Sequence, residues 1–218
     1  MRQVPPDVPM RPVTTVLPAG AELWRCHATS RPVTDFNPVP SHRHVGGGRF
    51  DGADDDRYRF LYAAFEPLTA LAETLLRDIP YGETGVRPVP WVTASSRSLS
   101  KARVTEDLRL VRLVSQADLA AVFQDTWLLE GGDDRYGLTR YWAQEIRRHA
   151  PDAQGMVWQS RRNRPHHALV LFGDRCGDEP LKAVPEDSYA LGTFEGAERA
   201  NQLLAPLRAF LLPPGMRT

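Results

Sequence analysis

The sequence predicts an α+β protein built around one mixed central β-sheet. Short strand-like runs alternate with amphipathic helical stretches, but without the regular rhythm of βαβ units, and no interior segment resembles a linker. The length of 218 residues suits one domain, and 42% hydrophobic and 25% charged residues are ordinary for a globular protein. We therefore expect a single domain over residues 21–218. It follows a Pro-rich N-terminal arm, residues 1–20, that is extended and unpacked.

Five segments are typical of strands because they are short, apolar and β-compatible: residues 22–27, 60–64, 108–114, 155–159 and 167–172. Residues 31–59, 80–100 and 131–134 are rich in Gly, Pro, Ser or Asp and are expected to be loops.

Four segments predict helices. The first begins at Pro67, whose missing N–H is harmless in a first turn, and its apolar stripe comprises Leu68, Leu71, Ala72, Leu75 and Leu76. Glu73 lies off the centre of this stripe. Ser115 and Asp118 form a capping-box pattern that opens a second helix, to about Gln124. Thr139 is expected to cap a third helix that ends near His149, and a fourth spans about 197–210.

Composition limits the class of protein. The formal net charge is zero, which argues against a dedicated nucleic-acid binder. Of the 27 basic residues 25 are arginines, which reflects either genomic base composition or guanidinium forks that bind phosphate or carboxylate. The two cysteines, Cys26 and Cys176, form no CxxC pattern and suit a reducing cytosol. Without a signal peptide or an apolar run of membrane length, we expect a soluble, cytoplasmic protein.

Several well-known site motifs are missing. There is no P-loop and no nucleophile elbow, and Gly46-Gly47-Gly48 does not match the dinucleotide-binding fingerprint. His42 and His44 lack a third ligand, and the acidic run at residues 54–56 lacks the spacing of a calcium loop. We therefore expect no metal site.

Five residues are chemical candidates, each with a plainer alternative. Arg25 lies within an apolar strand and is either ion-paired or facing a cleft. Arg49 follows three glycines, in a turn that is either flexible or shaped for close approach to a ligand. Tyr62 is a core or a cleft residue. Glu73 either pairs with the arginine one turn later or serves in a site. Ser160 alone is a turn serine.

Taken in order, these residues resemble the RES domain, a family named for its Arg, Glu and Ser. The resemblance rests on Arg25 in a first strand and on four short motifs: Gly47-Gly48-Arg49-Phe50, Leu61-Tyr62-Ala63-Ala64, Leu71-Ala72-Glu73 and Gly155-Met156-Val157-Trp158-Gln159-Ser160-Arg161. It spans about residues 23–172, with a weaker tail to residue 211. Three positions depart from the family pattern: Cys26 replaces Tyr, Phe50-Asp51 replaces Trp-Asn, and Gln159 replaces Pro.

The resemblance implies a diphtheria-toxin-like ADP-ribosyltransferase fold and a toxin of a toxin–antitoxin pair that degrades NAD+. It implies an Xre-like antitoxin that carries the DNA-binding function, so this chain itself would bind neither nucleic acid nor membrane; a homodimer is compatible with it. NAD+ is then the substrate rather than a cofactor, and inorganic phosphate is the expected co-substrate.

The chemistry of the five candidates agrees with cleavage of the bond between ribose and nicotinamide. Arg25 and Arg49 can bind the pyrophosphate and Tyr62 the nicotinamide. Glu73 can stabilise an oxocarbenium-like transition state, and Ser160 can bind the carboxamide or a phosphate. We also expect Arg161 and Arg162, near Ser160, to recruit phosphate.

Three alternatives to phosphorolysis stay open. Water as acceptor gives a glycohydrolase, and a protein side chain gives a mono-ADP-ribosyltransferase. A module that binds the nucleotide without turnover belongs to a different class.

Overall fold

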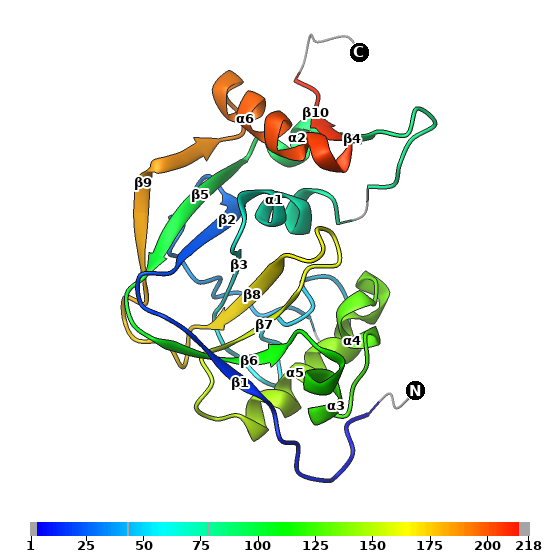
Figure 1. Ribbon diagram of the computed structural model, residues 1–218, viewed down its shortest axis with the longest axis vertical. Helices are drawn as coiled ribbons and strands as arrows, with labels where there is room; N and C mark the ends of the chain where they lie inside the picture. The colour runs from blue at the N-terminus through cyan, green and yellow to red at the C-terminus, as the bar shows by residue number, and fades with distance from the viewer. Residues whose placement is uncertain (1–3, 43, 78, 214–218) are drawn as a thin grey trace.

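An eight-stranded mixed sheet forms the centre of the protein (Figure 1). The computed structural model describes residues 4–42, 44–77 and 79–213. In spatial order the strands are β1 (Thr14–Leu17), β6 (Leu108–Leu113), β7 (Gly155–Gln159), β8 (His167–Phe172), β3 (Phe60–Ala64), β2 (Glu22–Ala28), β5 (Arg97–Val104) and β9 (Leu181–Ala190). Neighbours are antiparallel except β6 and β7, which run parallel. The predicted α+β class with a mixed sheet is confirmed.

Helices and a small second sheet cover this framework. The helices are α1 (Pro67–Leu75), α2 (Trp91–Ala94), α3 (Gln116–Ala121), α4 (Trp127–Glu130), α5 (Tyr136–His149) and α6 (Phe194–Leu204), with 3-10 turns η1 (Asp133–Arg135) and η2 (Ala205–Leu207). β4 (Arg87–Val89) and β10 (Ala209–Leu211) pair in parallel. Figure 1 shows α3, α4 and α5 gathered near β6 at one end, and α6 with β4 and β10 at the other, above α1. No helix among the described residues is both long and apolar enough to cross a membrane.

Three apolar clusters hold these layers together. The first packs α3, α4 and α5 on β6, β7 and β8, with Trp142 and Phe172 completely buried. The second packs α1 and α6 on β2 and β5. The third joins Leu23, Leu61 and Leu169 on neighbouring strands. The predicted stripe of the first helix contributes directly, because Leu71 and Leu75 belong to the second cluster.

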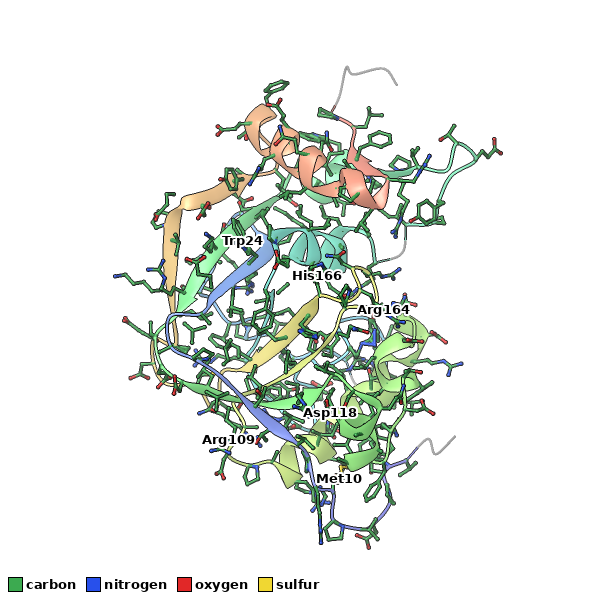
Figure 2. All side chains as sticks on the ribbon, in the orientation of Figure 1. Met10, Trp24, Arg109, Asp118, Arg164 and His166 are labelled. Atoms are coloured by element: carbon green, nitrogen blue, oxygen red, sulfur yellow. The ribbon has the colours of Figure 1, made fainter. Side chains whose placement is uncertain are left out.

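The N-terminal arm is more ordered than predicted. Thr14–Leu17 form β1, which pairs with β6 as an edge strand. Met10 is 5% exposed and joins the first apolar cluster near α3, where the Arg11 amide donates to the Ala121 carbonyl (Figure 2). The expectation of an unpacked arm is therefore wrong for this part. The Pro-rich composition concealed a four-residue strand.

The observed elements also differ from the predicted ones where a strand contains many polar residues, and at the ends of two helices. Residues 80–100 were expected to be a loop but contain β4, α2 and the start of β5, and β9 was not predicted. β5 lies between β2 and β9 and buries Ser98 and Ser100, so its small polar residues hide a central strand. Thr139 does not cap a helix, because α5 begins at Tyr136. The last helix ends at Leu204, and β10 follows it.

Candidate active site

The main cavity opens where β2 and β3 part. The two strands pair at one position, Trp24 opposite Ala64, and beyond it both line a cavity of about 700 Å³ that α1 closes on one side. This volume lies within the range of small-molecule sites. Among the described residues, five arginines and one carboxylate line it: Arg25, Arg31, Arg49, Arg77, Arg97 and Glu73. The excess of positive charge favours an anionic ligand.

Glu73 is brought to this cavity by the packing of α1. Its neighbours Leu71 and Ala72 are completely buried in the second apolar cluster, which leaves Glu73 half-buried at the cavity. Its Oε1 accepts a hydrogen bond of 2.5 Å from the Ser160 hydroxyl. The alternative partner, Arg77, instead donates to the Gly47 carbonyl at 3.0 Å. The helix thus presents a carboxylate that is oriented by the loop after β7, 87 positions later in the sequence.

Ser160 donates a hydrogen bond to Glu73 but does not itself line the cavity. The residue is completely buried, and its hydroxyl accepts the backbone N–H groups of Arg162 and Asn163, both at 3.1 Å, while donating to Glu73. Asn163 in turn donates its side-chain amide to Thr69 on α1 at 2.8 Å. Ser160 is not among the residues that line the cavity. The Ser160 hydroxyl thus orients Glu73 in this structure, and the direct contact between Ser160 and NAD+ stays a prediction.

Substituting Ser160→Ala is expected to lower both stability and turnover. Two backbone N–H groups lose their acceptor, so the free energy of unfolding should fall by about 1–3 kcal/mol. Glu73 loses its orienting donor, so kcat should fall about tenfold with a smaller change in KM. Urea denaturation and NAD+ kinetics check both effects. The matched control is Ser115→Ala, which removes the cap of α3 outside the cavity and should leave kcat unchanged. Equal kcat values for the two variants would contradict the assignment.

Arg25 lies on β2 just beyond the single pairing with β3. Its Nη1 donates to the carbonyl oxygens of Val33 and Asp35, at 2.8 and 2.6 Å. Burial lowers its pKa to about 10, so it stays protonated at neutral pH. Because its hydrogen-bond partners are main-chain carbonyls rather than a carboxylate, the guanidinium is oriented while its charge remains available to a ligand.

Arg49 follows a turn whose shape depends on its glycines. Gly47 has φ +73°, a conformation that favours glycine, and a Cβ on Gly48 would lie 2.5 Å from Oδ1 of Asp51. Arg140, which is 1% exposed, donates to the carbonyls of Gly46 and Gly48. The glycines therefore allow a tight backbone path that ends at Arg49.

The Arg49 side chain reaches α4 and the residue that follows it. It donates to the carbonyls of Leu128 and Gly131, at 3.1 and 3.3 Å, and burial lowers its pKa. Its guanidinium lies 5.4 Å from the centre of the Tyr136 ring, and that of Arg77 lies 5.2 Å from the same ring. Tyr136 also lines the cavity and was not predicted, since a tyrosine at the start of α5 carries no local signal of this position.

Tyr62 is fixed at both ends of its side chain. Its hydroxyl accepts the Phe50 N–H at 2.8 Å, and its ring meets Trp158 edge to face at 6.2 Å. Burial raises its pKa well above the ordinary value, so the phenol is neutral. Both aromatic residues line the cavity. They offer a rigid apolar wall near Arg49.

Arg161 and Arg162 do not line the cavity, although the sequence predicts that they recruit phosphate there. Arg161 donates to the carbonyls of Glu130 and Gly131, at the end of α4. The neighbouring Arg164 pairs with the Glu130 carboxylate, and Figure 2 shows it on the side of α4. Arg161 thus joins the loop after β7 to the segment that also holds Arg49.

Comparison with known proteins fits this arrangement. A model of the RES domain matches residues 22–192, which is most of the chain and includes all five candidates. The chain belongs to the RES-domain family. The resemblance inferred from its short motifs is therefore confirmed.

The RES domain of this chain also has a structural neighbour. It is similar to the toxin chain of the crystal structure of the M. tuberculosis MbcT–MbcA toxin–antitoxin complex. The TM-score is 0.54 and the identity 14%, over 79% of this chain and 85% of that chain. This similarity shows that the two chains share a fold. No curated protein matches the chain.

Proposed function

We propose that the protein is the NAD+-degrading toxin of a toxin–antitoxin pair and that it cleaves the N-glycosidic bond to nicotinamide. The observation that carries the proposal is the Glu73 carboxylate, oriented by Ser160 in a cavity that five arginines also line. NAD+ matches this arrangement because it combines an anionic pyrophosphate with a ribosyl carbon that becomes positive during cleavage. Membership of the RES family and the fold shared with a toxin of known structure support it further.

In this proposal the arginines bind the substrate. Arg25 and Arg49 contact the pyrophosphate, and their anchoring through carbonyl oxygens keeps both guanidinium groups in place before NAD+ arrives. Tyr62 and Trp158 form the apolar wall against which the nicotinamide ring lies.

Glu73 acts on the ribose that carries the nicotinamide. The bond between the ribosyl carbon and the nicotinamide nitrogen breaks, and its electron pair leaves with the ring, which becomes neutral nicotinamide. Positive charge develops on the ribose, and the Glu73 carboxylate stabilises it. An oxygen of the acceptor then forms the new bond to the same carbon. When phosphate attacks, its proton is released and no redox change occurs.

We propose inorganic phosphate as the acceptor, so that the products are nicotinamide and ADP-ribose-1″-phosphate. Mass spectrometry of reactions with and without phosphate tests this choice. Free ADP-ribose in the presence of phosphate would instead identify a glycohydrolase. ADP-ribose attached to added cell proteins would identify a mono-ADP-ribosyltransferase. NAD+ that is bound but intact would leave a nucleotide-binding module.

Arg161→Gln is expected to leave the phosphate dependence of the reaction unchanged within about twofold. Its guanidinium is engaged with two carbonyl oxygens and does not line the cavity, so its loss removes no direct contact with a bound phosphate. The measurement is the rate of nicotinamide release as a function of phosphate concentration. A tenfold higher half-saturating concentration would restore the role that the sequence predicts.

We also propose that an Xre-like antitoxin binds this chain and inhibits it. The structural neighbour comes from a toxin–antitoxin complex, and the zero net charge of this chain suits a division of labour in which the antitoxin binds DNA. Co-expression with the product of an adjacent reading frame should suppress NAD+ loss and give a complex that co-purifies. Undiminished NAD+ loss with every adjacent product would contradict the pairing.

A further inference from the structure

Arg97, at the start of β5, differs from the other arginines of the cavity. Its Nε is buried without a hydrogen-bond partner, and its side chain makes no hydrogen bond or ion pair with the part of the chain that the structure describes. Each of the other four donates at least one hydrogen bond to a protein oxygen: Arg25 to Val33 and Asp35, Arg31 to Asn37, Arg49 to Leu128 and Gly131, and Arg77 to Gly47. Arg97 is thus a cation of this cavity whose partner is missing.

The groups around Arg97 do not neutralise it. Burial raises the pKa of the Cys26 thiol to about 12, so this neighbour is uncharged at neutral pH. The charge of Arg97 also acts on His27, and burial lowers the pKa of His27, which leaves a neutral imidazole. Among the residues that the structure describes, the carboxylate that lines the cavity is Glu73, and it accepts a hydrogen bond from Ser160. A guanidinium donor that is buried and unpaired is unfavourable, so an anion is expected to bind there.

The position of Arg97 places this anion on a defined side of the cavity. Arg97 pairs with Ala28 at the end of β2 and follows α2, and Pro90 and Thr93 line the cavity on the same side. Arg49 and Tyr136 line the same cavity from the Gly-rich turn and the start of α5, and Figure 1 shows α2 and α5 at opposite ends of the molecule. The arginines of the cavity therefore come from well-separated elements of the fold.

We propose that Arg97 binds a phosphate group of the ligand. The guanidinium fork, including its Nε, can donate to phosphate oxygens. The phosphate then supplies the hydrogen-bond acceptors that the Arg97 side chain lacks. This inference rests on the proposed function only for the identity of the ligand. The proposed reaction offers two sources of phosphate. One is the pyrophosphate of the dinucleotide, and the other is the inorganic phosphate that attacks the ribose.

Calorimetric titration of the full-length protein distinguishes these forms. The probes are ADP-ribose, which carries the pyrophosphate but no nicotinamide, and inorganic phosphate. The variant is Arg97→Gln, and the matched control is Arg103→Gln. Arg103 lies on the same strand, is about half exposed, and pairs with Glu22 outside the cavity. Arg97→Lys keeps the charge but loses the fork, so its affinity should lie between those of the wild type and Arg97→Gln.

Arg97→Gln is expected to weaken the binding of one probe at least tenfold, while Arg103→Gln changes neither by more than twofold. Loss for ADP-ribose alone places the dinucleotide pyrophosphate at Arg97, and loss for inorganic phosphate alone places the co-substrate there. Unchanged binding of both probes to folded Arg97→Gln protein would overturn the proposal, as would a wild-type protein that binds neither. If the wild type binds a probe through Arg97 but leaves NAD+ intact, the phosphate site stands and the proposed function fails.

Discussion

Glu73→Gln is expected to lower the rate of nicotinamide release by about a thousandfold. The substitution keeps the size of the side chain and an oxygen that accepts from Ser160, but it removes the negative charge that stabilises the positive ribose. The effect should lie in kcat, with KM for NAD+ changed less than about threefold, because the pyrophosphate contacts remain. Steady-state kinetics of the purified variant measure both constants.

The stability of this variant should be nearly that of the wild type. Glu73 is half-buried and lies outside the apolar cluster that holds α1 to the sheet, so the free energy of unfolding should change by less than about 1 kcal/mol. Glu66→Gln is the matched control, since this exposed carboxylate caps the same helix without a side-chain hydrogen bond and does not line the cavity. A Glu73→Gln enzyme with wild-type kcat would remove Glu73 from the mechanism.

Arg25→Ala is expected to raise KM for NAD+ by about 10–100-fold. The guanidinium is charged and held in place at the cavity, so its loss removes charge-assisted hydrogen bonds to the pyrophosphate. The same substitution leaves the carbonyls of Val33 and Asp35 without their donor, which should lower the free energy of unfolding by about 1–3 kcal/mol. Kinetics at a temperature where the variant stays folded separate the two effects.

Arg175→Ala controls for the structural part of that loss. Its guanidinium also donates to main-chain carbonyls, those of Ala150, Ala153 and Arg147, but it lies outside the cavity. We expect a comparable loss of stability with an unchanged KM. If Arg175→Ala raised KM as strongly as Arg25→Ala, the effect at Arg25 would be structural and its role in binding would be wrong.

The sequence correctly predicted those elements in which the local residue pattern and the tertiary packing favour the same structure. The stripe on the first helix predicted both its buried face and the displaced position of Glu73, because a helix of regular period must bury its apolar residues. The capping box at Ser115 and Asp118 forms as predicted, since it depends on four consecutive residues. The ordered motifs identified the family, which local propensity alone does not indicate.

Features that depend on distant segments were missed. β5 has the composition of a loop, and only its place between β2 and β9 makes it a strand. Neither Arg97 nor Tyr136 has a local signal, because each reaches the cavity through the packing of its own element. The hydrogen bond from Ser160 to Glu73 was missed for the same reason, because it spans 87 positions in the sequence.

The most direct test of this account is the fate of NAD+ in the presence of the purified full-length protein without antitoxin. Proton NMR follows NAD+ and nicotinamide in the same sample, with the Glu73→Gln protein as the parallel control. The account predicts that nicotinamide appears in an amount equal to the NAD+ lost, and about a thousandfold more slowly with the variant. Intact NAD+ in a sample of folded wild-type protein that binds ADP-ribose would contradict it.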